Sequence, residues 1–240
     1  MGIAYILGRE LQSLRQSVAS PSRSARAAHR AFAVAYGKIL AAAGVANRHA
    51  MPGAEQRATD GTTGAAHSST DLEPSATREY LTNSKLVVHI RPAHPDDEAA
   101  LIDLFACVSE KDLRFRFGGT AQSIGASVVA PLLPESSKAC ITFLAYAAGT
   151  LIAVSTLADT PGTREAEVAL SVHRDWKGKG VAWTLLEHTL SYATEHGLRT
   201  VTSLQSGEEY DAVNLEREMG FVVRLVSASP VELLLSKDVR

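Results

Sequence analysis

The stretch that decides the fold is residues 172–197, which read VHRDWKGKGVAWTLLEHTLSYATEHG. Two glycines, Gly178 and Gly180, stand between a β-rich run and a run whose apolar residues recur at helical spacing. Gly197 then occupies the position at which helices commonly end. The pattern therefore predicts a strand, a glycine turn and a long helix over residues 180–196.

This glycine turn has the properties of an anion site. Gly178 and Gly180 lack a Cβ atom, so the backbone can approach a ligand closely. The first turn of the following helix offers unpaired N–H groups and the positive end of the helix dipole. Lys177 and Lys179 add positive charge. Neither the third glycine of the dinucleotide fingerprint nor a P-loop ending is present. From the residues alone, a pyrophosphate cradle and a tight turn with two solvated lysines both stay open.

Short β-rich runs and helical patterns extend on both sides of the turn. Ala148-Gly149 separates two of the runs and is a hairpin signal. The expected strands are residues 86–91, 139–147, 150–158, 165–173, 199–205, 221–227 and 231–237. Helical spacing also predicts helices near residues 98–108 and over residues 209–219. We therefore expect an α+β fold with a mixed, mostly antiparallel sheet flanked by helices.

The first 84 residues differ from the rest in amino-acid composition. They are rich in Ala, Arg and Ser, and helix-prone runs occupy much of residues 7–43. Residues 52–84 carry few large apolar side chains, which is typical of a linker. The sequence thus predicts an N-terminal extension over 1–84, partly helical and then flexible, and a domain over 85–240. The extension can be a tail with loose helices or an arm for targeting or for a partner.

Composition excludes several classes of function. The net charge of −2 gives no reason to expect a nucleic-acid partner. No run of about 18 apolar residues exists, so no membrane span is expected. Cys107 and Cys140 lie in apolar contexts, as reduced thiols in the cytoplasm would. No histidine pair has metal-ligand spacing with a Cys or Asp partner, so no metal site is expected.

Residues 172–197 resemble the acyl-CoA-binding motif of the GCN5-related N-acetyltransferases (GNAT), whose pattern is Gln/Arg-x-x-Gly-x-Gly/Ala. Lys177 stands at the Gln/Arg position, Gly180 at the first glycine and Ala182 at the Gly/Ala position. VVHIRPAHPDDEAAL (87–101) looks like the family's opening strand and helix, and EREMGF (216–221) like a late helix-to-strand joint. The resemblance covers about residues 85–240. It implies the GNAT fold, and an N-acetyltransferase with acetyl-CoA as cosubstrate.

Two further stretches suggest a subgroup. SEKDLRFRFGG (109–119) and AEVALSVHRDWKGKG (166–180) are similar to the acetyltransferase domain of bacterial protein-lysine acetyltransferases. This resemblance implies an amine acceptor on a protein lysine. A small-molecule amine or amino acid is the alternative acceptor, which the loop around 109–135 would select. A non-catalytic module that senses acyl-CoA is an alternative of another class, because Lys177 lacks the forked donors of arginine.

Glu167 is the candidate catalytic base. A lysine amine has a pKa of about 10.4, so it must lose a proton before it attacks a thioester. The subgroup resemblance places the catalytic glutamate at this position. Independently, Glu167 lies about 16 Å along a strand from Val172, where a pantetheine arm from the turn would deliver its thioester. Glu165, on the same face, is the second candidate. Glu167 can alternatively be a solvated charge paired with Arg164 or Arg174.

The resemblance also implies that backbone groups of Leu170, Ser171 and Val172 bond the pantetheine amides. The full set of predicted cofactor-binding residues is Leu170, Ser171, Val172, Lys177, Gly178, Lys179, Gly180, Val181 and Ala182. Many family members carry a general-acid tyrosine five residues before the phenylalanine of the late joint. Counting back from Phe221 gives Glu216 instead, and Tyr210 lies earlier in the same helix. The thiolate can also leave without a dedicated acid.

Overall fold

Alternating apolar residues build one large sheet, which the computed structural model shows for residues 77–117, 125–134, 140–159, 163–228 and 231–240. The strand order is β1-β2-β3-β4-β5-β6-β8-β7. Every neighbouring pair is antiparallel except β5 and β6, which are parallel. The strands are β1 (Arg78–Leu81), β2 (Val87–Pro92), β3 (Cys140–Ala147), β4 (Thr150–Asp159), β5 (Glu165–Val172), β6 (Thr200–Ser206), β7 (Val222–Ala228) and β8 (Val231–Asp238). The predicted mixed, mostly antiparallel sheet is confirmed.

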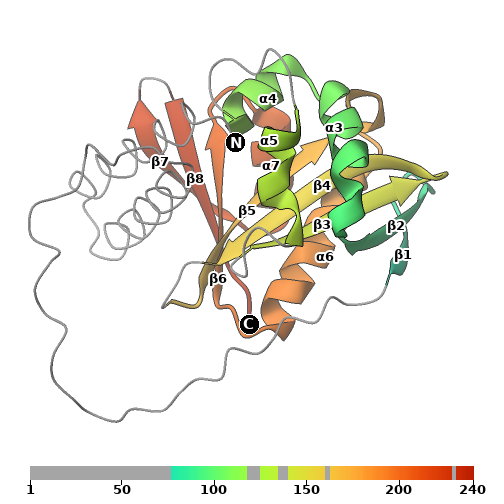
Figure 1. The fold of residues 1–240 in the computed structure, drawn as a ribbon. Helices are drawn as coiled ribbons and strands as arrows, with labels where there is room; N and C mark the ends of the chain where they lie inside the picture. Colours follow the sequence, from blue (N-terminus) through green and yellow to red (C-terminus); the bar gives the residue numbers. More distant parts are fainter. Residues whose placement is uncertain (1–76, 118–124, 135–139, 160–162, 229–230) are drawn as a thin grey trace, which may run out of the picture. The chain divides into compact units, whose positions relative to one another are not determined.

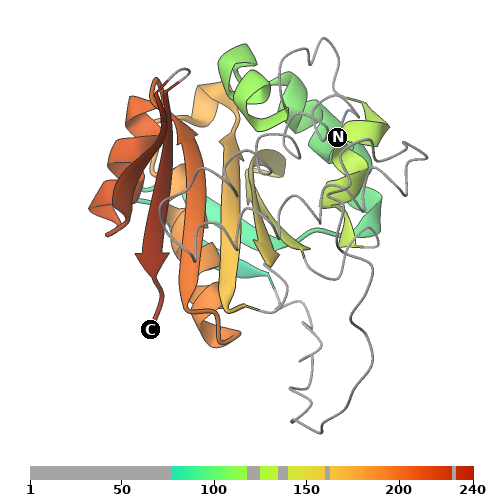
Figure 2. The same cartoon turned by 90° about the vertical axis from the view of Figure 1, so that its left-hand side faces the viewer.

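Helices cover both faces of the sheet. Figures 1 and 2 show α3 (Glu98–Ala106), α4 (Glu110–Phe117) and α5 (Ala126–Val129) on one face. The other face carries α6 (Val181–Glu195) and α7 (Tyr210–Glu218). Short 3-10 turns are η1 (Pro95–Asp97), η2 (Ala130–Leu132) and η4 (Arg174–Trp176). None of the helices in the described ranges is both long and apolar enough to cross a membrane.

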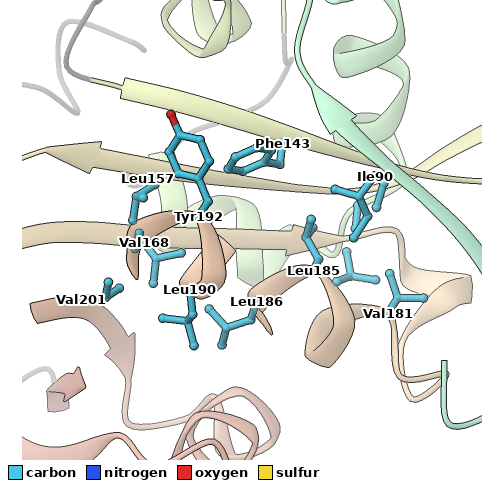
Figure 3. Packing of buried hydrophobic residues seen from close by; sticks show 14 of the residues in the cluster. Ile90, Phe143, Leu157, Val168, Val181, Leu185, Leu186, Leu190, Tyr192 and Val201 are labelled. Atoms are coloured by element: carbon cyan, nitrogen blue, oxygen red, sulfur yellow. The ribbon is translucent and has the colours of Figure 1, made fainter. Parts of the chain in front are cut away.

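The core lies in two layers because side chains alternate across each strand. On β3, Phe143 packs under α6 and Leu144 packs under α3. Figure 3 shows the α6 layer, in which Leu185 and Leu190 lie against strand residues such as Val168. Burial of a leucine of this kind contributes about 2 kcal/mol relative to its exposure to water. This packing fixes α6 on the sheet, and with it the glycine turn at the amino end of the helix.

The predicted hairpin between β3 and β4 is also confirmed. Ala148 and Gly149 have φ angles of 47° and 80°. Positive φ at both central residues is the geometry of a two-residue turn that matches the twist of the flanking strands. The long helix, predicted over residues 180–196, is observed as Val181–Glu195.

Two elements correct the interpretation of the sequence. Residues 52–84 were expected to be a linker, but Arg78–Leu81 form strand β1, which pairs with β2. The strand is short and polar, and contacts far along the chain hold it, so local composition does not reveal it. The connection after Val108 contains helix α4. The predicted helices and linker within residues 1–76 lie outside the described part of the chain.

Candidate active site

The parallel strands β5 and β6 stay paired for only part of their length. The register joins Glu165–Glu167 to Thr200–Thr202, and Glu167 opposite Thr202 is the last pair. Beyond it the strands separate towards their carboxyl ends (Figure 1), β5 continuing beside β4 and β6 beside β8. Residues 168–172 therefore pair with β4 alone among the described residues. Their backbone groups on the β6 side border a wedge in the sheet and are available to a ligand.

The glycine turn lies at the open end of this wedge. Gly178 and Gly180 have φ angles of 72° and 76°, which favour glycine. The first helical bond of α6 runs from Thr184 N to Gly180 O at 3.0 Å. The amides of Val181 and Ala182 precede this bond and are orphan donors of the helix terminus. The structure thus brings the two glycines and these two amides together as one potential anion site.

The two lysines of the turn are already engaged. Lys177 Nζ lies 2.6 Å from Asp112 Oδ2 of α4. Lys179 Nζ lies 4.8 Å from the centroid of the Trp176 ring, a cation–π contact. Both ammonium groups stay at the turn, but Asp112 offsets the charge of one of them. A phosphate contact by either lysine side chain stays a prediction, and Asp112 is a residue that the sequence did not reveal.

The β1–β2 hairpin buttresses the same turn. Ser84 Oγ donates a hydrogen bond of 2.8 Å to Lys179 O. A Cβ atom placed on Gly180 would lie only 3.1 Å from Thr82 Cβ, so the two backbones are in close contact here. The sequence missed both hairpin residues, because 95 positions separate Ser84 from its partner.

The rest of β1 follows α6 along its length. Arg78 pairs with Glu195 near the carboxyl end of the helix, at 3.8 Å. Tyr80 Oη lies 2.7 Å from His188 Nδ1 in the middle of the helix. Burial lowers the pKa of His188 to about 4, so the imidazole is neutral at neutral pH. β1 therefore runs from one end of α6 to the glycine turn at the other.

Glu167 and Ser171 lie on the face of β5 that is turned towards α3, α4 and α5. The residues between them in the alternation, such as Val168, pack under α6 instead. Glu167 is half-buried, as is the second candidate Glu165. Arg116 of α4 donates hydrogen bonds to Ser171 Oγ at 3.3 Å and to Thr156 Oγ1 at 3.2 Å. The hydroxyl of Ser171 is thus held by Arg116, and its predicted cofactor contact depends on its backbone.

Helix α4 connects the two loops that follow β5 and β6. Asp112 binds Lys177 after β5, and Lys111 Nζ lies 3.1 Å from Glu209 Oε1 and 2.8 Å from Glu208 O after β6. The sequence does carry a capping pattern at the start of this helix, from Ser109 to Asp112. In the structure, Asp112 N donates a hydrogen bond of 3.3 Å to Ser109 Oγ. Ser-x-x-Asp before a helix is such a signal.

Tyr210, which the sequence offers as a possible general acid, differs sharply in environment from Glu216, which stands where many family members have a tyrosine. Tyr210 begins α7 and is 72% exposed. Glu216 is 5% exposed, and its Oε1 accepts hydrogen bonds from Ser203 Oγ at 2.9 Å and from Gln205 Nε2 at 2.6 Å. Burial raises the pKa of Glu216 to about 7, although both hydrogen bonds act in the opposite direction. Tyr210 is therefore exposed to solvent, whereas Glu216 is a buried carboxyl with a raised pKa.

A metal site was not expected from the sequence. Within the described residues, no group of three or more His, Cys, Asp or Glu side chains could hold a metal ion. The expectation that no metal takes part stays a prediction.

Comparison with known proteins agrees with this geometry. Residues 119–221 match the model of the acetyltransferase (GNAT) family. The GNAT domain of S. lividans PAT has a TM-score of 0.62 at 24% identity, covering 68% of this chain and 96% of that one. The ribosomal-protein-S5-alanine acetyltransferase from Vibrio fischeri gives 0.56 at 11% identity, covering 69% and 97%. A probable acetyltransferase from Staphylococcus epidermidis gives 0.54 at 16% identity, covering 64% and 99%. At these identities the solved structures show the fold.

The fold, the family match and the glycine turn at the wedge are mutually consistent. The family binds acyl-CoA and implies acetyl-CoA as the acyl donor. Residues 119–221 thus match the acetyltransferase (GNAT) family, and the fold of the domain agrees with that match.

Proposed function

We propose that this domain transfers the acetyl group of acetyl-CoA to an amine, most suitably a protein lysine, with Glu167 as the general base. The observation that carries the proposal is the position of Glu167 at the last β5–β6 pair, where the wedge closes. The glycine turn lies at the opposite, open end. The five residues from Val168 to Val172 span about 16 Å between these two ends.

Acetyl-CoA is proposed to occupy this distance. Its pyrophosphate would accept hydrogen bonds from the amides of Val181 and Ala182, where Gly178 and Gly180 permit close approach. Lys177 and Lys179 add positive charge to the same turn. The pantetheine amides would bond the open backbone edge of Leu170, Ser171 and Val172, as an added strand does. The thioester then reaches the closed end of the wedge beside Glu167.

The chemistry needs one base and no metal. A lysine ammonium at the acceptor face gives a proton to the Glu167 carboxylate and becomes nucleophilic. The amine attacks the thioester carbonyl, the C–N bond forms, the C–S bond breaks, and CoA leaves as a thiolate. The half-buried position of Glu167 on the face towards α3, α4 and α5 supports an acceptor that arrives from that side.

A small carboxylate-bearing amine is a second candidate acceptor. Its support is Arg116, whose guanidinium lies on the same face over Ser171 and Thr156. An arginine fork is well suited to hold a carboxylate, such as that of an amino acid. Parallel assays with lysine peptides and with free amino acids distinguish the two acceptors. If Arg116→Gln raises KM for amino acids only, the second candidate is favoured.

The matched pair Glu167→Gln and Glu165→Gln tests the base. Loss of a general base reduces the rate by about 100-fold or more. We expect that loss in kcat for Glu167→Gln, with an unchanged Kd for acetyl-CoA by calorimetry. Glu165→Gln should stay within about threefold of wild type. Equal turnover of Glu167→Gln and wild type would remove Glu167 as the base. Tight acetyl-CoA binding without transfer to any acceptor would instead favour the sensing module.

A further inference from the structure

Glu216 carries a buried carboxyl that the proposed reaction does not use. Its Oε1 is held by Ser203 and Gln205 of β6. Its Oε2 is buried and has no hydrogen-bond partner among the described residues. By contrast, the buried carboxylate of Asp97 forms two hydrogen bonds with Arg91. Burying a polar atom without a hydrogen-bond partner destabilises the folded protein, unless a ligand or another group supplies the hydrogen bond.

The position of this carboxyl along the sheet is fixed by its partners. Ser203 is the residue directly after Thr202, the last β6 residue that pairs with β5. The carboxyl of Glu216 therefore lies at the closed end of the wedge, on the α6 and α7 face. Glu167 lies opposite Thr202, so its side chain is at the same height on the other face. The two glutamates bracket the closed end of the wedge from opposite sides of the sheet.

From this geometry we infer that Glu216 is the second catalytic group, with its Oε2 directed at the sulfur of bound acyl-CoA as the proton donor to the leaving thiolate. The inference rests on the proposed function, because it needs the thioester at the closed end of the wedge. Two carboxyl groups would then divide the proton transfers, with Glu167 acting on the amine and Glu216 on the sulfur.

The protons balance in this scheme. The ammonium of the acceptor loses one proton to Glu167 before attack, and a second proton leaves the nitrogen as the amide forms. The C–S bond breaks, and the thiolate takes the proton from Glu216 Oε2. Solvent returns a proton to Glu216 after CoA leaves and accepts those released from the amine side. The net products are the N-acetyl amine, CoA with a free thiol and one proton, with no oxidant or reductant.

The surroundings of Glu216 suit a neutral acid. Its raised pKa of about 7 lies below the value of about 8.5 for an ordinary thiol, so proton transfer to a thiolate is favourable. On β8, the residues opposite Ser203 and Gln205 are Leu235 and Leu233, which are apolar. The other charged residues of α7 are Asp211, Arg217 and Glu218, and Lys237 of β8 bonds Met219 O, at the carboxyl end of this helix.

The first test compares Glu216→Gln with Glu218→Gln, an exposed neighbour on the same helix. The glutamine keeps the side-chain volume and an acceptor for Ser203, but it has no transferable proton. General-acid catalysis is worth about 100-fold, so we expect kcat to fall by about that factor with the Kd for acetyl-CoA within twofold. Wild-type kcat should also decline as pH rises through about 7, and Glu216→Gln should lack this limb. An unchanged kcat and pH profile in Glu216→Gln would overturn the inference.

Ser203→Ala provides a second variant that retains the carboxyl. The hydrogen bond from Ser203 lowers the pKa of Glu216, so its removal should move the alkaline limb of kcat to higher pH. A merely structural role of Glu216 would leave the position of that limb unchanged, and such a result would contradict proton donation.

A binding measurement separates failure of this inference from failure of the proposed function. CoA and desulfo-CoA differ only at the sulfur. We expect wild type to bind CoA more tightly, and this ratio of Kd values to fall about fivefold in Glu216→Gln, the effect of about one hydrogen bond. The ratio should persist in Glu218→Gln. No acetyl transfer by wild type would contradict the proposed function, whereas an identical ratio in all three proteins would overturn the contact between Glu216 and the sulfur.

Discussion

Gly180 is the residue at which the glycine turn, helix α6 and the β1–β2 hairpin meet. Its φ angle is 76°, and it directly precedes the first helical residue, Val181. A Cβ atom here would lie 3.1 Å from Thr82 Cβ and 3.4 Å from Asn83 N. The substitution Gly180→Ala therefore imposes backbone strain and also presses the hairpin away from the turn.

The expected loss of stability in Gly180→Ala can be derived by comparison with other glycines of positive φ. A left-handed conformation costs an alanine about 1 kcal/mol. Gly149 has a φ angle of 80°, and Gly178 one of 72°, and nothing lies within 4 Å of a Cβ atom on either residue. Gly149→Ala should thus lower the free energy of unfolding by about 1 kcal/mol through strain alone. Gly180→Ala adds the contact with Thr82 and weakens the Ser84 hydrogen bond, so we expect about 2–3 kcal/mol.

Urea denaturation at 25 °C and calorimetry with acetyl-CoA check both parts. The slope of the unfolding free energy against urea should be the same in all variants, so that the midpoints report stability. A displaced turn should weaken acetyl-CoA binding about tenfold in Gly180→Ala, equivalent to about 1.4 kcal/mol, and leave it unchanged in Gly149→Ala. Equal stability and affinity of these two variants would refute the view that the hairpin holds the turn.

Two further outcomes are expected. Tyr80→Phe removes the hydrogen bond to His188 and should lower the free energy of unfolding by about 1 kcal/mol, whereas the exposed Tyr210→Phe should not change it; urea midpoints measure both. Asp97→Asn tests a pH dependence. Burial acts to raise the pKa of Asp97, but hydrogen bonds from Arg91 and a backbone amide together lower it. Its contribution is therefore present above about pH 4 and is lost as the pH falls through the lowered pKa. The stability difference between wild type and Asp97→Asn should shrink between pH 7 and pH 3, and a constant difference would contradict the assignment.

The elements that the sequence predicts well are those with strong local signals. Gly178, Gly180 and Gly197 mark the turn and both ends of α6. Between them, apolar residues recur at helical spacing and predict the helix itself. β1 has no such signal, because its stability depends on contacts such as Tyr80 with His188, 108 positions away. α4 has a local signal, because Ser109 can cap the amino end of a helix. However, its apolar residues at 113, 115 and 117 alternate as in a strand, and this favours the wrong element.

The features of the candidate site also differ in whether a local sequence signal predicts them. Alternation along β5 predicts that Glu165 and Glu167 share a face, and the observed strand agrees. The wedge has no local signal, because it depends on where β6 stops pairing with β5. The same holds for the ion pair of Asp112 with Lys177, since the pairing partner of an exposed lysine is decided by which helix packs nearby.

The course of β1 also decides how the domain responds to mechanical load. The chain enters the sheet at Arg78, and the β1 register runs from Arg78 opposite Ile90 to Leu81 opposite Val87. A pull on residue 77 directed away from the domain would open these pairs one after another, in the manner of a zipper, beginning beside the carboxyl end of α6. The contact of Ser84 with Lys179 would be the last to bear force. Tension on the N-terminal side would thus reach the glycine turn only after the strand had peeled away.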